Sequence, residues 1–133
     1  MSRAPFTVLI VEDEAQLRRV LERALTKAGY RVLGAGSAET AYELLASEQP
    51  DAVLLDVRLP AMSGLGLYLA LLHRTPKLAG RMAIMTGDAE ADHVRAWLER
   101  NPCPVLKKPF NLHEIVDWVR SVLHASSRER GNG

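Results

Sequence analysis

Short apolar runs alternate with segments of helical periodicity along the chain, and this alternation restricts the fold more than any other feature. Strand-like runs are expected at residues 8–11, 30–35, 52–55, 81–85 and 105–106. Each run is followed by a stretch that is long enough for a helix. Parallel strands need crossovers of that length, whereas a hairpin needs only a short turn. The pattern therefore predicts a doubly wound α/β domain with five parallel strands and five helices.

The expected helices carry their own start signals. Ser37 is expected to cap the second helix and Asp88 the fourth, whose inner face would carry Val94 and Trp97. Asn111, with Glu114 three residues later, predicts a capping-box-like start for the last helix. The third helix is expected over residues 65–73.

The apolar stripe of the last helix ends at Leu123, and no such stripe follows it. We therefore expect one domain over residues 1–124 and a flexible C-terminal tail over residues 125–133. A chain of 133 residues is long enough to bury most of its apolar surface as one domain.

Composition excludes several classes of function. A net charge of +1, from 17 basic and 16 acidic residues, gives no excess for direct nucleic-acid binding. Cys103 is the single cysteine of the sequence, which excludes an internal disulfide and any Cys/His metal spacing. The sequence has neither a signal-peptide pattern nor an apolar stretch of membrane-spanning length. We expect a cytoplasmic protein that does not contact a membrane.

Charged and polar residues follow the expected strands where the apolar runs end. Glu12 and Asp13 follow the first strand, Asp56 the third, Thr86 the fourth and Lys108 the fifth. In an open parallel sheet, ligands bind outside the carboxyl ends of the strands. Adjacent buried carboxylates are costly unless a cation compensates them. The pattern therefore predicts an acidic pocket in which a divalent metal and Lys108 supply positive charge.

Together, these motifs resemble the receiver domain of two-component response regulators over residues 7–123. The matching pieces are Glu12-Asp13, Asp56 followed by Val57-Arg58-Leu59-Pro60, then Met62-Ser63-Gly64, Thr86, and Lys108-Pro109-Phe110. The resemblance implies a flavodoxin-like (βα)5 fold with strand order 2-1-3-4-5, which brings the first and third strands together. It also implies a cis peptide bond between Lys108 and Pro109.

The resemblance implies a Mg²⁺-dependent reaction in phosphorelay signal transduction. A histidine kinase or histidine phosphotransfer protein would donate a phosphoryl group to the Asp56 carboxylate. Asp13 and Asp56 would bind Mg²⁺ directly, Glu12 through water, and Arg58 through its backbone carbonyl. No other cofactor is expected. Such a protein is a signalling phosphoacceptor that catalyses its own phosphorylation and slow dephosphorylation, not an enzyme acting on a separate substrate.

The remaining two residues have roles that the resemblance implies. Lys108 would pair with Asp56 at rest and with a phosphoryl oxygen afterwards. Thr86 would donate its hydroxyl to another phosphoryl oxygen and shift a two-state equilibrium that alters binding of a downstream protein. Homodimerisation on phosphorylation is one form that this response can take. The chain fits both a single-domain regulator and the receiver of a hybrid histidine kinase.

Three positions depart from the family pattern or bear on alternatives. Val105 stands where many receivers have an aromatic residue, which keeps a phosphorylation-independent interaction module as the alternative function. Arg58 stands where a phosphatase of the haloacid dehalogenase type needs a second aspartate, which disfavours that enzyme class. Arg58 and Asp88 each lie two residues after a site residue, and we hypothesise an ion pair between them that limits access of water.

Overall fold

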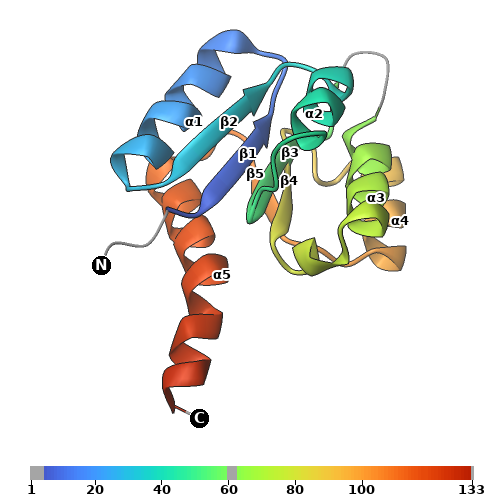
Figure 1. Ribbon diagram of the computed structural model, residues 1–133. Coiled ribbons are helices and arrows are strands. Elements are labelled where there is room, and N and C mark those ends of the chain that lie inside the picture. Colours follow the sequence, from blue (N-terminus) through green and yellow to red (C-terminus); the bar gives the residue numbers. More distant parts are fainter. Residues whose placement is uncertain (1–4, 60–62, 133) are drawn as a thin grey trace.

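One parallel five-stranded sheet forms the centre of the computed structural model, which describes residues 5–59 and 63–132 (Figure 1). The strands are β1 (Thr7–Val11), β2 (Arg31–Ala35), β3 (Ala52–Asp56), β4 (Met82–Thr86) and β5 (Val105–Lys107). Their order in the sheet is β2-β1-β3-β4-β5, as the resemblance implied. The expected doubly wound α/β fold is confirmed.

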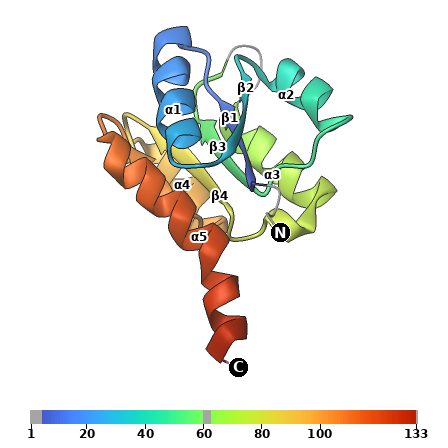
Figure 2. The same ribbon diagram turned by 60° about the vertical axis from the view of Figure 1, so that its left-hand side comes forward.

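Helices cover both faces of this sheet. They are α1 (Ala15–Lys27), α2 (Ala38–Leu45), α3 (Gly64–Arg74), α4 (Asp92–Arg100) and α5 (Leu112–Asn132), with a 3₁₀ turn at Pro76–Leu78. The side chains of α1 and α5 pack on one face, and those of α2, α3 and α4 pack on the other. Figure 2 shows the same arrangement from a second direction.

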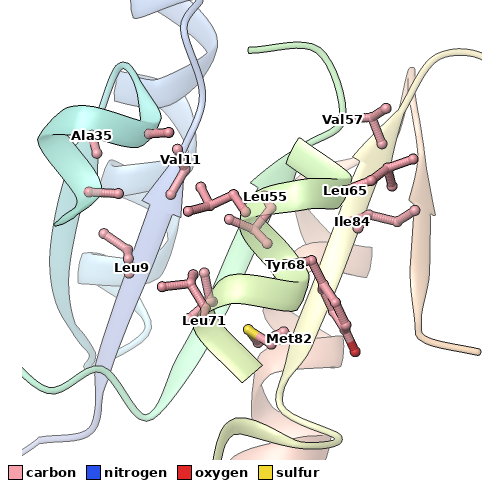
Figure 3. Packing of buried hydrophobic residues seen from close by; sticks show 14 of the residues in the cluster. Leu9, Val11, Ala35, Leu55, Val57, Leu65, Tyr68, Leu71, Met82 and Ile84 are labelled. Atoms are coloured by element: carbon pink, nitrogen blue, oxygen red, sulfur yellow. The ribbon is translucent and has the colours of Figure 1, made fainter. Parts of the chain in front are cut away.

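The three central strands are buried along their whole length because helices cover both sides of the sheet. Successive side chains point to opposite faces. Val8 and Ile10 therefore join the cluster beneath α1 and α5, whereas Leu9 and Val11 join the one beneath α2, α3 and α4. Figure 3 shows this second cluster, in which side chains of α3, among them Leu65, Tyr68 and Leu71, pack on side chains of the strands. A core packed on both sides holds the carboxyl ends of the strands in fixed positions.

The helix starts agree with the sequence in two cases and differ in a third. The Ser37 hydroxyl accepts from the Thr40 N–H, and the Asn111 side chain accepts from the Glu114 N–H. Asp88, however, does not cap α4, which begins at Asp92. The Asp88 N–H instead donates to the Thr86 hydroxyl, and this bond keeps Asp88 within the β4–α4 loop. The inward direction of Val94 and Trp97 is confirmed.

The last helix is longer than its apolar stripe. α5 continues to Asn132, so residues 125–132, the segment expected to be a flexible tail, are helical. In Figures 1 and 2 the end of α5 extends beyond the rest of the domain. Loss of an apolar stripe argues against packing on the sheet, but Ala, Arg and Glu in this segment still favour a helix. The flexibility of this segment stays a prediction.

None of the helices within residues 5–59 and 63–132 combines the length and the apolar character that crossing a membrane requires.

Cys103 is a half-buried residue that packs against the α2-α3-α4 core cluster. Burial raises the pKa of its thiol to about 11, although a hydrogen bond with Tyr68 opposes that rise. Because the thiolate is the reactive form, we expect iodoacetamide at pH 8 to alkylate the folded chain roughly 100-fold more slowly than the urea-unfolded chain. Mass spectrometry of timed samples measures both rates. Equal rates would show that the fold does not protect the thiol.

Candidate functional site

The strand register brings the sequence-predicted site residues to one edge of the sheet. Val11 of β1 lies opposite Leu55 of β3. The residues that follow these two, Glu12 and Asp56, therefore lie level with one another. Further along the edge, Asp56 of β3 lies opposite Met85 of β4 in the strand register. The Lys108 N–H donates to the Thr86 carbonyl at 2.8 Å. A pocket of about 430 Å³ opens here. Its lining residues are Glu12, Asp13, Glu14, Asp56, Arg58, Thr86, Gly87, Asp88 and Lys108.

Burial distinguishes the site residues from ordinary surface charges. Glu12 is 1% exposed, Asp56 5% and Thr86 6%, whereas Asp13 is exposed. Apart from tyrosines, Thr7 is the one further polar or charged side chain that is buried among the residues whose burial is described. Burial of two neighbouring carboxylates requires compensation by a cation or by hydrogen bonds.

Lys108 supplies part of that compensation, through Asp56 and also through Glu12. Its Nζ lies 2.8 Å from Oε1 of Glu12 and 3.3 Å from Oδ2 of Asp56. The pairing with Asp56 that the resemblance implied is present, and Glu12 is a second, closer partner of Lys108. Side-chain direction beyond a strand end decides this, and sequence spacing does not carry that information.

The charged groups of the site shift the pKa values of Glu12 and Lys108. Burial raises the pKa of Glu12 to about 7; the hydrogen bond from Lys108 opposes this rise, and the neighbouring Asp56 adds to it. Burial lowers the pKa of Lys108, but the hydrogen bond to Glu12 and the charges of both carboxylates outweigh burial, so its pKa is raised overall. Lys108 therefore remains a cation throughout the neutral pH range.

Removal of the Lys108 charge should destabilise the metal-free domain. Breaking a fully buried ion pair costs about 3–5 kcal/mol. Because the Lys108 side chain is 24% exposed, we expect Lys108→Met to lower the free energy of unfolding by about 2 kcal/mol. Urea titration in EDTA measures this change. The matched control is Lys107→Met, since Lys107 is exposed and adjacent, and it should change stability by less than about 0.5 kcal/mol. Equal losses in both variants would contradict the role of Lys108.

Backbone N–H groups orient three of the site side chains. Oδ1 of Asp56 accepts from the Arg58 N–H at 3.1 Å, and Oε2 of Glu12 accepts from the Glu14 N–H at 3.2 Å. The Thr86 hydroxyl accepts from the Asp88 N–H at 3.0 Å. A hydroxyl that accepts one bond can still donate its own hydrogen. Thr86 can therefore donate to a group that enters the pocket.

The three carboxylates suit a small divalent cation. Glu12, Asp13 and Asp56 each offer one oxygen, and these three oxygens lie within 4.8 Å of one another. Mg²⁺ prefers oxygen ligands at about 2.0–2.1 Å in octahedral geometry, so opposite ligands are about 4 Å apart. Two carboxylates in direct contact and a third acting through water fit this spacing. The donor set therefore fits Mg²⁺.

Gly64 holds the end of β3 close to the start of α3, a contact that sequence reasoning missed. Its N–H donates to the Val57 carbonyl at 2.9 Å. A Cβ on this residue would lie 1.8 Å from the carbonyl oxygen of Asp56. Only glycine permits this approach of two backbones. The glycine itself was part of the matched motif, but its contact depends on the loop path. Pro60 and Met62 of that motif lie outside the described residues.

Three further features singled out in the sequence have the following places in the structure. Arg58 and Asp88 both line the pocket, but no ion pair joins them in the part of the chain that the structure describes, so the hypothesised pair is not formed. Val105 packs against the core cluster on the α4 side. The expected cis peptide bond between Lys108 and Pro109 is confirmed.

Comparisons with known proteins agree on one protein family. The sequence model of the family described as "Response regulator receiver domain" matches residues 8–120. The DNA-binding transcriptional regulator NtrC of Escherichia coli (strain K12) is 34% identical over 124 residues, which cover 92% of this chain and 26% of NtrC. The chain therefore spans about a quarter of the length of this relative.

Solved structures show the same likeness. The receiver domain of TorR, a response regulator of the TMAO respiratory system, matches with a TM-score of 0.79 and 30% identity, covering 91% of this chain and 98% of that one. A CheY-like receiver domain protein from Methanospirillum hungatei JF-1 matches with a TM-score of 0.83 and covers 95% of this chain and 99% of that one. At 22% identity, this second match supports the fold alone.

Proposed function

The chain belongs to the response regulator receiver domain family, and from that premise we propose that Asp56 accepts a phosphoryl group from a phosphorylated histidine. The donor is a histidine kinase or a histidine phosphotransfer protein. One observation carries the proposal: Asp56 is 5% exposed, yet it faces a pocket whose lining also includes Lys108, Thr86 and the carboxylates of Glu12 and Asp13. A buried carboxylate with these neighbours suits phosphoryl transfer better than it suits a structural role.

The proposed reaction is a single displacement at phosphorus. A carboxylate oxygen of Asp56 forms a bond to phosphorus while the bond between phosphorus and the histidine nitrogen breaks, and that electron pair returns to the imidazole. Lys108 lies 3.3 Å from Oδ2 of Asp56 and can donate to a phosphoryl oxygen from this position. The Thr86 hydroxyl donates to a second oxygen. Phosphoryl transfer depends mainly on such positioning and charge stabilisation.

Mg²⁺ is the cofactor that we propose for this pocket. Asp13 and Asp56 bind it directly, Glu12 binds it through water, and the Arg58 carbonyl completes the protein ligands. The bound ion stabilises the negative charge of the phosphoryl oxygens. Glu12 suits the more distant position because its Oε1 already accepts from Lys108 at 2.8 Å. Asp13 is exposed, and one of its carboxylate oxygens lies within 4.8 Å of an oxygen of Glu12 and of Asp56.

Phosphorylation is proposed to act as a cytoplasmic signal. A phosphoryl oxygen that bonds the Thr86 hydroxyl draws the β4–α4 loop toward Asp56, because the Asp88 N–H is bonded to that hydroxyl. The surface of α4 and β5 then changes its affinity for a downstream protein or for a second copy of the chain. Val105 packs against the α4 side of the core, so this movement proceeds without an aromatic side chain at that position.

The experiment that tests this function uses acetyl phosphate as a small phosphoryl donor. Wild-type protein incubated with acetyl phosphate and Mg²⁺ should gain one phosphoryl group, measured by intact-protein mass spectrometry. Removal of Mg²⁺ with EDTA should lower the rate at least about 100-fold, because the charge of the phosphoryl group is then poorly compensated.

Two results would contradict the proposal. No adduct with Mg²⁺ present would favour the alternative of a phosphorylation-independent interaction module. An adduct that forms equally fast in EDTA would exclude the metal site. Restoring Mg²⁺ to the EDTA-treated sample is the control, and it should restore the rate.

A further inference from the structure

Arg18 lies on α1, and its side chain contacts the backbone of the Glu12-Asp13 pair. Its Nη1 donates to the carbonyl oxygen of Glu12 at 2.7 Å. Its Nε lies 3.6 Å from Oε1 of Glu22, one helical turn further along α1. The two side chains are 24% and 35% exposed, so water only partly screens the pair. Arg18 thereby connects the first helix to the end of the first strand.

The peptide group that Arg18 contacts joins Glu12 to Asp13. The other side of Glu12 is also held, since its N–H donates to the Ala35 carbonyl at 2.9 Å. The orientation of this peptide sets the direction in which both carboxylate side chains leave the backbone. Arg18 is therefore placed to control the geometry of two of the three carboxylates in the pocket.

The neighbouring strand β2 leaves space for this arrangement. A Cβ on Gly34 would lie 2.6 Å from Oε1 of Glu22, and one on Gly36 would lie 3.1 Å from Nη1 of Arg18. Two glycines at the end of β2 thus allow the Arg18–Glu22 pair to pack closely against the strand backbone.

We propose that Arg18, aligned by Glu22, is a positioning residue that orients Glu12 and Asp13 for binding of a divalent cation. This inference rests on the proposed metal site. Groups that orient the ligands of a metal ion influence its affinity through geometry. Arg18 does not touch the ion itself and acts through the Glu12–Asp13 peptide.

The direction in which Mg²⁺ affinity changes when Arg18 is replaced distinguishes a positioning role from a purely electrostatic one. Arg18 carries a positive charge near an acidic pocket, so its charge alone disfavours Mg²⁺. If charge were the main effect, Arg18→Gln would bind Mg²⁺ more tightly than wild type. If positioning dominates, the same variant binds Mg²⁺ more weakly. A purely structural role would lower the stability of the domain and leave the affinity for Mg²⁺ unchanged.

Isothermal titration of the whole chain with Mg²⁺ measures this affinity, and urea unfolding in EDTA measures stability. We expect Arg18→Gln to weaken Mg²⁺ binding about tenfold, and Arg18→Lys, which keeps one donor, to weaken it about threefold. The matched control is Arg23→Gln, which removes the same charge from an exposed position of α1. It should bind Mg²⁺ as wild type does, or slightly more tightly.

A second variant tests the arrangement without changing any charge. Gly34→Ala displaces the Glu22 carboxylate, which is flexible enough to move aside, so the domain should fold. We expect about threefold weaker Mg²⁺ binding because Arg18 loses its alignment. This variant decides the question if Arg18→Gln does not fold.

The contradicting results are distinct from a failure of the proposed function. Folded Arg18→Gln that binds Mg²⁺ as tightly as wild type, or more tightly, would overturn the positioning role and leave the metal site intact. If Arg18→Gln does not fold, unchanged affinity in Gly34→Ala would overturn it. Wild-type protein that binds no Mg²⁺ would overturn the metal site and the positioning role together.

Discussion

Asp56→Asn should abolish the phosphoryl adduct, lowering its rate of formation by more than about 100-fold, because an amide cannot replace the carboxylate nucleophile. Asparagine keeps the shape of the side chain and an oxygen that accepts from the Arg58 N–H. The substitution also removes one of the two carboxylates that share Lys108. We therefore expect the free energy of unfolding in EDTA to stay within about 1 kcal/mol of wild type. Intact-protein mass spectrometry with acetyl phosphate and Mg²⁺ measures the adduct.

Two control variants accompany Asp56→Asn. Asp117→Asn removes an exposed carboxylate of α5, whose nearest basic partner is Arg120 at 3.8 Å, and should form the adduct at the wild-type rate. Asp13→Asn keeps the acceptor but removes a proposed metal ligand, so the adduct should form more slowly. An adduct that forms in Asp56→Asn at the wild-type rate would place the acceptor elsewhere.

Gly64→Ala should lower the free energy of unfolding by about 3 kcal/mol or more, which is at the upper end of overpacking effects. The added Cβ would lie 1.8 Å from the Asp56 carbonyl oxygen and 2.9 Å from the Cα of Val57. Both are backbone atoms, so the end of β3 or the start of α3 must shift. Because that shift also moves Asp56, the rate of phosphorylation should fall. Urea titration measures the change in stability.

Gly66→Ala is the matched control because Gly66 lies two residues further along the same helix. A Cβ there would meet nothing within 4 Å. Alanine in a helix interior is about 0.5–1 kcal/mol more favourable than glycine, so this variant should be slightly more stable than wild type. Equal stability of the two variants would show that the β3–α3 connection tolerates a side chain.

The sequence predicted the helices and strands of the fold, but it did not always predict the residues at which they begin and end. Apolar runs and helical spacing predicted the alternation of strands and helices because burial on both faces requires that pattern. Spacing alone could not order the strands, and the order came from the family resemblance. α4 begins after the expected cap because Asp88 takes part in a local turn with Thr86. α5 continues past its apolar stripe because local propensity also determines where a helix ends.

The sequence predicted which residues line the candidate site, but not the contacts among them. The residues that line the pocket could be found at the strand ends because parallel strands all end at the same edge. The contacts among them depend on side-chain directions and loop paths. Sequence spacing therefore did not reveal that Lys108 lies closer to Glu12 than to Asp56. It also did not reveal the contact of Arg18 with the Glu12 carbonyl.

Borohydride reduction of the phosphorylated chain tests the central proposal most directly. Borohydride reduces an acyl phosphate to an alcohol and leaves free carboxylates intact, so a phosphorylated aspartate becomes homoserine. Trypsin then separates the candidates, since Asp56 lies in the peptide of residues 32–58 and both Glu12 and Asp13 lie in that of residues 4–18. We expect tandem mass spectrometry to find homoserine at position 56. Reduction at position 12 or 13, or no reduction in protein that carries the adduct, would contradict Asp56 as the phosphoacceptor.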